Sequence, residues 1–295
     1  MTTQLSVPDT QLTEPDEPAA ARVTWTAFRR NPLGMAAIGV MALFAVVAVA
    51  APLIADYPSG HGPRVLVGPS STYWFGTDGL GRDIFSEVVW GTRSSLLTAV
   101  AATILAVALG LVLAVTSVYF KWLDGAVGVV VDLVLSLPVL PLMLLVAALV
   151  GPSQVTVVLV IAFFSWPEVA RIVRSQGLTV VRLPYVDAAR VVGGSSFWII
   201  RRHIVPAVAP VVVVALVLTV SRAVLVAAGL SFLGVGDPNA WSWGRILFEA
   251  QQSGAMQSAW WTALFPSLAI FLLVLSAILV SIAYDDARHA RIWER

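Results

Sequence analysis

The chain has 295 residues, of which 58% are hydrophobic and only 12% are charged. Soluble domains carry about a quarter charged residues, so this composition excludes a soluble globular protein and indicates an integral membrane protein. The net charge of +1 says little about function, because in a membrane protein the placement of the charges matters more than their sum. The absence of Cys excludes a disulfide framework, a thiolate metal site and a cysteine nucleophile.

The N-terminal segment, residues 1–33, is predicted to be a disordered tail with a membrane-proximal end. Its first part is rich in Pro, Asp and Glu and poor in large apolar side chains. The apolar run that follows, Gly34–Ile54, is longer than the roughly 7–15-residue core of a secretory signal. At about 1.5 Å per residue it reaches about 30 Å, so a first transmembrane helix is predicted over 34–55.

An extracytoplasmic or interfacial loop is predicted over 56–95. Within it, Thr77–Gly79 has the composition of a turn in which a short acid bonds its own backbone. The apolar residues between Ile84 and Val89 fall on one helical face, which predicts a helix seated at the outer surface of the membrane.

The rest of the chain, 96–284, is predicted to be a helical core. Pro138 and Pro141 should bend the third span by removing backbone donors. Five further spans are predicted at 96–119, 126–150, 155–170, 207–230 and 263–284, which makes six in all.

Charge placement predicts the orientation. In a six-span topology thirteen Lys and Arg residues fall on one side and four on the other, and Arg222 falls inside a span. Cytoplasmic loops carry the excess of positive charge, so the 1–33 tail, the 171–206 loop and the 285–295 C-terminus are predicted to be cytoplasmic.

The stretch Pro184–Pro206 is amphipathic although it lies between two spans. Apolar residues recur at helical spacing on both sides of Gly193-Gly194, which predicts two short helices joined by a glycine elbow. Periodicity alone allows two interpretations: docking into a groove on a partner protein, or lying on anionic lipid.

This stretch resembles the cytoplasmic loop of bacterial ABC-importer permeases, whose motif reads acid-Ala-Ala, then Gly, then an apolar residue and Pro. The family usually has Glu where this chain has Asp187. The residues that the resemblance assigns to ATPase coupling are Asp187, Ala188, Ala189, Gly193, Gly194, Phe197 and Pro206.

Three other segments are similar to the C-type permeases of dipeptide, oligopeptide and nickel importers: Phe75–Leu96, Gly229–Pro238 and the tryptophan-containing stretch 243–266. Three departures stand out. Glu87 occupies a position where the branch commonly has Arg, Ala227 replaces an acid, and the C-terminal Gly-Asp and Asp-Pro signature survives only as Asp285 and Arg288.

The resemblance implies an all-α membrane protein with six transmembrane helices, the type I ABC-importer permease fold and both termini cytoplasmic. Its implied function is that of a permease subunit in the bacterial cytoplasmic membrane, moving di- or oligopeptides by alternating access. Nickel or another peptide-like solute, such as glutathione or haem, is the alternative. A secondary transporter is a remote one, because no half-repeat is evident.

The implied partners are a second homologous permease, two ATP-binding subunits (or one fused ATPase), an extracytoplasmic solute-binding protein, the peptide and the lipid bilayer; nucleic acid is not expected. The chain has no Gly-x-x-x-x-Gly-Lys-Ser/Thr motif and no hydrolase motif. ATP and Mg are therefore expected on the partner ATPases, with no cofactor, no metal and no enzymatic activity in this chain.

Two charges fall within predicted spans and are costly in lipid, by a few kcal/mol on insertion scales. Asp132 lies about 9 Å from the cytoplasmic end of its span and Arg222 about 22 Å from that side, so they are not expected to pair. Asp132 is expected to have a structural partner. Arg222 either faces the translocation path or is a buried structural residue. The tryptophans at 241–261 are expected to form an interfacial belt.

Overall fold

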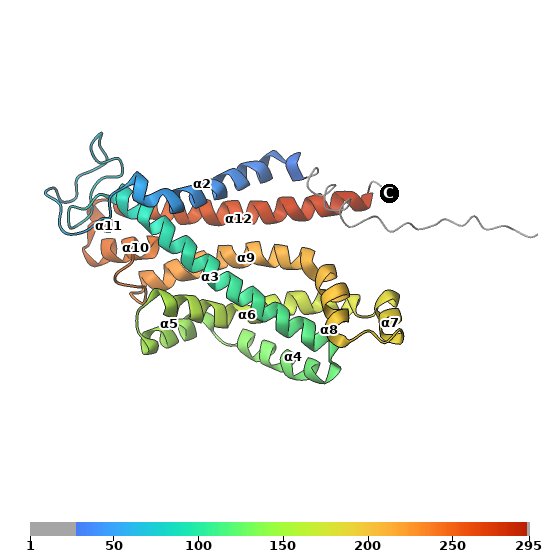
Figure 1. Ribbon diagram of the computed structural model, residues 1–295. Coiled ribbons are helices and arrows are strands. Elements are labelled where there is room, and N and C mark those ends of the chain that lie inside the picture. Colours follow the sequence, from blue (N-terminus) through green and yellow to red (C-terminus); the bar gives the residue numbers. More distant parts are fainter. Residues whose placement is uncertain (1–27, 294–295) are drawn as a thin grey trace, which may run out of the picture.

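The computed structural model describes residues 28–293, with side chains to residue 287, and every regular element in that part of the chain is a helix (Figure 1). The predicted tail falls largely outside these residues. The elements are α2 (Pro32–Ile54), α3 (Ile84–Tyr119), α4 (Lys121–Ser136), α5 (Val139–Val150), α6 (Gln154–Val180), α7 (Pro184–Val191), α8 (Ser196–Ile199), a π-helical turn (Ile200–Ile204), α9 (Val205–Phe232), α10 (Trp243–Gln252), α11 (Ala255–Ser258) and α12 (Trp261–Trp293).

Five helices in the described residues are long and apolar enough to cross a membrane, and the pair α4 and α5 makes a sixth if it counts as one broken span. The single bent helix predicted over 126–150 is wrong in this respect, because the two parts meet at 89°. Leu137 is extended (φ −81°, ψ 151°), as the residue before a proline prefers. Pro141 then lies in the first turn of α5, where its missing N–H leaves no helical bond unmade.

Two span boundaries differ from the sequence-based expectation. α3 begins at Ile84, so the expected surface helix is the first part of a 36-residue spanning helix. Asp83 starts it, since its side chain accepts a hydrogen bond from the Ser86 N–H. α6 continues through Pro167 to Val180, past the predicted end near 170, and the loop that follows it is correspondingly shorter.

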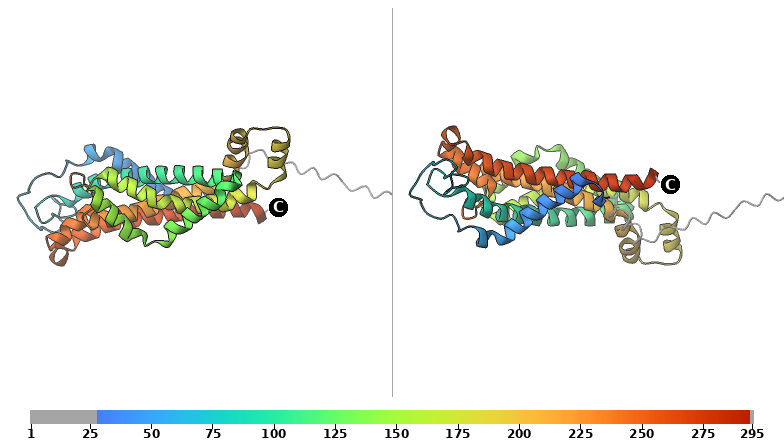
Figure 2. Two further views of the ribbon diagram at one scale, coloured as in Figure 1. Left: turned by 90° about the horizontal axis from the view of Figure 1, so that it is seen from below. Right: turned by 90° about the horizontal axis from the view of Figure 1, so that it is seen from above.

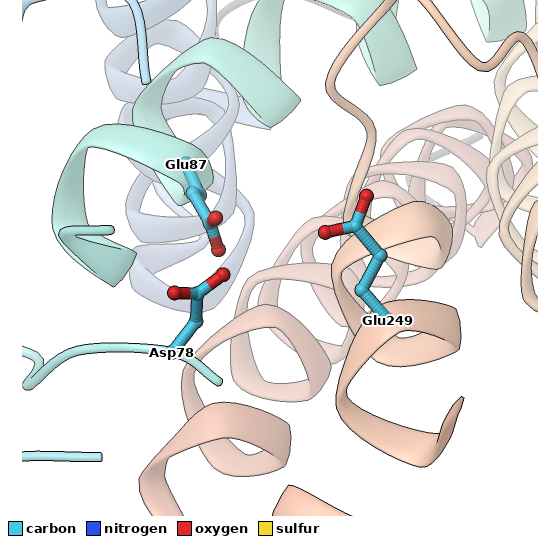
Figure 3. A group of neighbouring side chains, drawn as sticks. All are labelled: Asp78, Glu87 and Glu249. Atoms are coloured by element: carbon cyan, nitrogen blue, oxygen red, sulfur yellow. The ribbon is translucent and has the colours of Figure 1, made fainter. Parts of the chain in front are cut away.

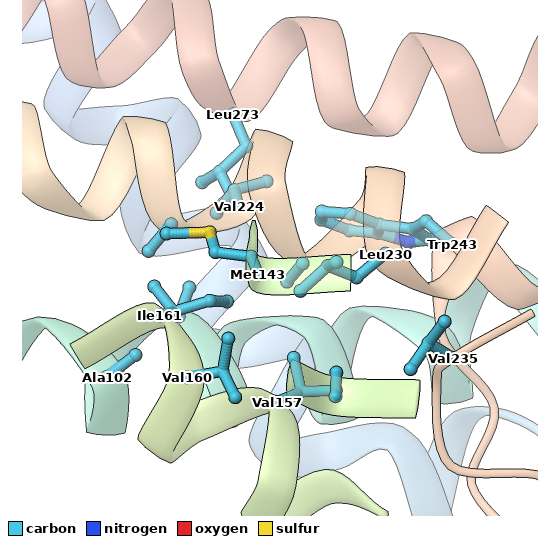
Figure 4. Packing of buried hydrophobic residues seen from close by; sticks show 14 of the residues in the cluster. Ala102, Met143, Val157, Val160, Ile161, Val224, Leu230, Val235, Trp243 and Leu273 are labelled. Atoms are coloured by element: carbon cyan, nitrogen blue, oxygen red, sulfur yellow. The ribbon is translucent and has the colours of Figure 1, made fainter. Parts of the chain in front are cut away.

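The larger buried apolar cluster lies where α3, α5, α6, α9, α10 and α12 meet (Figure 4), and a second lies between α3, α4, α6 and α9. Between α3 and α6 the contact is close because α3 presents small residues; a Cβ on Gly110 would lie 2.9 Å from the Trp166 carbonyl oxygen. Small residues let helix backbones approach closely in membranes, where van der Waals packing holds helices together. The buried small residues on this face of α3 are Ala99, Ala102, Ala106, Gly110 and Ala114.

The two ends of the bundle differ. The long loop between α2 and α3 lies at one end together with α10 and α11, whereas α7, α8, the start of α2 and the end of α12 lie at the other (Figure 1). Trp241 and Trp243, expected in an interfacial belt, are buried and donate to the carbonyls of Pro58 and Val88. They pack the end of the bundle that carries the loop between α2 and α3, and the belt prediction was wrong for both.

Candidate functional site

The hairpin of α7 and α8 projects to one side beyond the end of the bundle (Figure 2). Pro184 begins α7 at its first position, where the missing N–H costs nothing, and Ser195 caps α8 by accepting from the Trp198 N–H. Two short helices with a glycine elbow form here, as the sequence predicts.

The elbow itself is a Schellman motif. Gly193 N–H donates to the Arg190 carbonyl and Gly194 N–H to the Ala189 carbonyl, both at 3.0 Å. Gly193 is the left-handed residue of the elbow, with φ +86°, so the chain reverses there. Gly194 is required for another reason: a Cβ there would come within 2.8 Å of the Ala189 carbonyl oxygen.

The tip of the hairpin is apolar and exposed. Val191 is 87% exposed, Val192 88% and Phe197 72%, while Val186 is fully buried beneath them. Asp187 pairs with Arg190 at 2.7 Å on the exposed side of α7. Ala188 and Pro206 are also exposed, and Ala189 is half-buried. An exposed apolar group of this kind, with charges beside it, is typical of a protein contact surface.

A second feature, at the opposite end, is a buried charged cluster made by Asp78, Arg82, Glu87 and Glu249. Figure 3 shows its three carboxylates, which point toward one another from the loop before α3, from α3 and from α10. The Arg82 guanidinium donates to Asp78 Oδ2 from Nε at 2.8 Å and from Nη2 at 2.6 Å, and pairs with Glu249. Nε also lies 3.1 Å from Glu87 Oε1, an ion-pair contact without hydrogen-bond alignment because that N–H is directed at Asp78.

The cluster lines a cavity of about 470 Å³. Three carboxylates converge there, but Arg82 occupies the position between them that a cation would need, and the arrangement supplies no metal site. Burial by itself lowers the pKa of the Arg82 guanidinium, but the charges of Glu87, Asp78 and Glu249 outweigh it and raise the pKa above its usual value. Arg82 is therefore a permanent positive charge.

Aromatic and backbone contacts complete the cluster. The guanidinium carbons of Arg82 and Arg245 lie 4.5 Å and 4.4 Å from the centre of the Trp241 ring, and Arg245 pairs with Glu249 at 2.9 Å. Asp78 Oδ1 accepts from the Leu80 and Arg82 N–H groups, the turn that the sequence predicts. The cluster fastens the loop between α2 and α3 to α10. Sequence reasoning missed it, and its only signal was the unusual acid at position 87.

The third feature is a row of ion pairs on α6. Glu168 pairs with Arg222 of α9, Arg171 with Asp132 of α4 at 2.5 Å, and Arg174 with Asp124 of α4 at 2.7 Å. As expected, Asp132 and Arg222 do not pair with each other. Neither the partner of Asp132 nor that of Arg222 was predicted from the sequence. Position 171 was placed in a loop, and Glu168 at the very end of a predicted span.

Two family models match the chain. Residues 106–292 match "Binding-protein-dependent transport system inner membrane component", and residues 21–63 match "N-terminal TM domain of oligopeptide transport permease C". Among curated proteins, the glutathione transport system permease protein GsiD of Pectobacterium atrosepticum is 35% identical over 271 residues, covering 90% of this chain and 89% of the relative. GsiD of Escherichia coli is 36% identical over 273 residues, covering 91% and 89%.

Two solved structures share the fold. The inward-facing MetNI methionine ABC transporter matches with a TM-score of 0.54 at 21% identity, covering 69% of this chain and 95% of that one. An amino acid ABC transporter with histidines matches with a TM-score of 0.51 at 20% identity, covering 70% and 95%. The all-helical architecture found here is thus that of ABC-importer permeases.

Proposed function

The chain belongs to the family of binding-protein-dependent transport system inner membrane components. From this membership we propose that it is the permease subunit of an ATP-driven importer of di- and oligopeptides. Glutathione is among the candidate substrates. It is a multi-pass membrane protein and not an enzyme. The observation that carries the substrate class is the match of residues 21–63 to the N-terminal domain of oligopeptide permeases, together with relatives whose names specify glutathione transport.

The proposed assembly contains a second permease of similar fold, two ATP-binding subunits or one fused ATPase, and an extracytoplasmic solute-binding protein. ATP and Mg are bound by the ATPases, since this chain carries no phosphate-binding loop. Alternating access then requires a mechanical contact between the ATPases and the helix bundle.

The α7–α8 hairpin supports that contact better than it supports lipid binding. A lipid-bound amphipathic helix lies in the plane of the interface with its apolar face inward. Here the hairpin projects away from the bundle (Figure 2). Its exposed apolar side chains, Val191, Val192 and Phe197, flank the Gly193-Gly194 elbow in sequence. When ATP draws the ATPases together, the hairpin moves as a lever and the bundle opens outward.

The first prediction tests the function directly. Cells from which the gene is deleted should lose ATP-dependent uptake of labelled dipeptide or glutathione, and expression of this chain should restore it. Lowering ATP while the ion gradients persist should stop uptake. Uptake that follows the ion gradient and ignores ATP would favour a secondary transporter, and restored nickel uptake without peptide uptake would reject the peptide substrate.

The second prediction tests orientation, which is easy because the chain has no native Cys. Ser70→Cys and Ser253→Cys, both at exposed outer positions, should react with an impermeant thiol reagent applied to intact cells. Ser195→Cys, in the elbow of the hairpin, should react only after the cells are opened. Labelling of Ser195→Cys from outside would reverse the proposed topology.

A further inference from the structure

The ion pairs of α6 follow one another along the helix. Glu168, Arg171 and Arg174 are three residues apart, and each pairs with a residue of another helix: Arg222 on α9, then Asp132 and Asp124 on α4. Because residues three apart lie on neighbouring positions of a helix surface, the pairs form a continuous charged row from the middle of α6 towards its cytoplasmic end.

One end of the row, the pair Glu168 and Arg222, lies far from the ends of its helices. Glu168 is 14 residues from the start of α6, about 21 Å along its axis, and Arg222 is 17 residues from the start of α9, about 25 Å. The side chains of Arg222 and Glu168 are nevertheless 57% and 40% exposed in the single chain, and those of Arg171 and Asp132, nearer the helix ends, are 56% and 74% exposed. Charged side chains within spanning helices almost always face protein or water rather than lipid.

An independent feature adjoins the same row. Asp132 lies one turn before the break between α4 and α5, and the connecting residues Leu137 and Pro138, with Ser136 at the helix end, are all exposed. Non-helical backbone within the membrane is tolerated only where it is buried in protein or borders a water-filled cavity. Interrupted helices near the midplane are also where transporters place substrate sites.

We propose that this face is the inner half of the translocation path, and that its ion pairs bind the charged ends of a zwitterionic peptide by exchanging partners with it. The inference rests on the proposed function and names where in the chain the peptide binds. Arg222 and Arg171 take the peptide carboxylate, for which the planar guanidinium is suited, and Glu168 and Asp132 take the ammonium group. Each exchange replaces one ion pair by another, so no charge is left uncompensated at any step.

Water access is the first test. Ser136→Cys and Ser175→Cys each place a thiol four residues from a charge of the row, Asp132 and Arg171, at exposed positions. In inside-out vesicles holding the whole transporter, both should react with a charged thiol reagent about tenfold or more faster than Leu43→Cys, since only a thiol in water ionises readily. Leu43 is the matched control, because it is 61% exposed in the middle of α2, a helix without charged residues.

Peptide protection is the second test. A free dipeptide added to the cytoplasmic side should slow the modification of Ser136→Cys, and the same dipeptide acetylated and amidated at its ends should not. Arg222→Gln should raise the dipeptide concentration needed for protection about tenfold. Arg222→Lys keeps the positive charge but loses the planar guanidinium, so the dipeptide concentration that it needs for protection should lie between those of the wild type and of Arg222→Gln. It replaces the Gln variant in this test if that variant fails to assemble.

Two results would overturn the proposal. The first is that Ser136→Cys and Ser175→Cys react as slowly as Leu43→Cys in a transporter that imports peptide. The second is that free and capped dipeptide protect Ser136→Cys equally. The first would mean that the row is covered by the partner permease. If the wild-type transporter shows no ATP-dependent peptide uptake, the proposed function itself is rejected, whatever the labelling shows.

Discussion

Gly194→Val is expected to abolish peptide uptake while the chain still inserts and assembles in the membrane. The added Cβ would lie 2.8 Å from the Ala189 carbonyl oxygen, the same atom that accepts the Gly194 N–H. The elbow can relieve this contact only by opening, which changes the angle between α7 and α8 and the surface they present. Because motion of the ATPases would reach the bundle through this surface, we expect uptake to fall at least about tenfold, which corresponds to roughly 1.4 kcal/mol of lost coupling.

Position 193 offers a matched pair of variants. Its φ of +86° is strained for a β-branched residue, so Gly193→Val should behave like Gly194→Val. Asn tolerates left-handed backbone, so Gly193→Asn should retain most of the uptake. Both have open space around the new side chain, since nothing lies within 4 Å of a Cβ at this position. If Gly194→Val, Gly193→Val and Gly193→Asn all keep the uptake of the wild type, the elbow takes no part in the mechanism.

The contact itself can be detected by crosslinking. Ala188→Cys is exposed on α7 beside Asp187 and should form a disulfide with a cysteine in the groove of a partner ATPase, at a rate that changes when ATP is added. Asp187→Lys reverses a charge on this surface and should weaken the crosslink. If cysteines along the hairpin never crosslink in an assembled, active transporter, the hairpin does not dock there.

Arg82→Gln is expected to lower the stability of the folded chain by about 3–5 kcal/mol, the usual cost of removing one partner from a buried ion pair. It would leave Asp78, Glu87 and Glu249 facing one another without the guanidinium that neutralises them. The outer loop should then detach from α10. The loss can be measured as a lower midpoint of thermal unfolding of the purified transporter.

Two controls separate this effect from a general sensitivity of the outer loop. Arg64→Gln removes an exposed arginine from the same loop and should leave the midpoint nearly unchanged. Adding Glu249→Gln to Arg82→Gln removes one of the stranded carboxylates and should recover part of the stability, a coupling that a double-mutant cycle measures. Additive losses in the double variant would show that the two side chains do not interact.

The sequence by itself determined the class of protein, the positions of its spans and the hairpin. A helix in a membrane must satisfy its own backbone within the segment, so a long apolar run predicts a spanning helix with little help from its surroundings. The elbow is equally local, because the left-handed backbone at Gly193 favours glycine and a Cβ at Gly194 would lie 2.8 Å from the Ala189 carbonyl oxygen. What local pattern did not resolve there was which of the two glycines adopts the left-handed conformation; in the structure it is Gly193.

Only the tertiary structure decided how the charges are paired and which tryptophans are buried. Arg82 meets Glu249 across 167 positions of sequence, and Glu168 meets Arg222 because particular faces of α6 and α9 are in contact. Spacing along one helix does not encode which face of a distant helix will lie against it. The break at Leu137 and Pro138 was predictable only in part. The prolines indicated a bend, but its angle of 89° depends on the packing of the neighbouring helices.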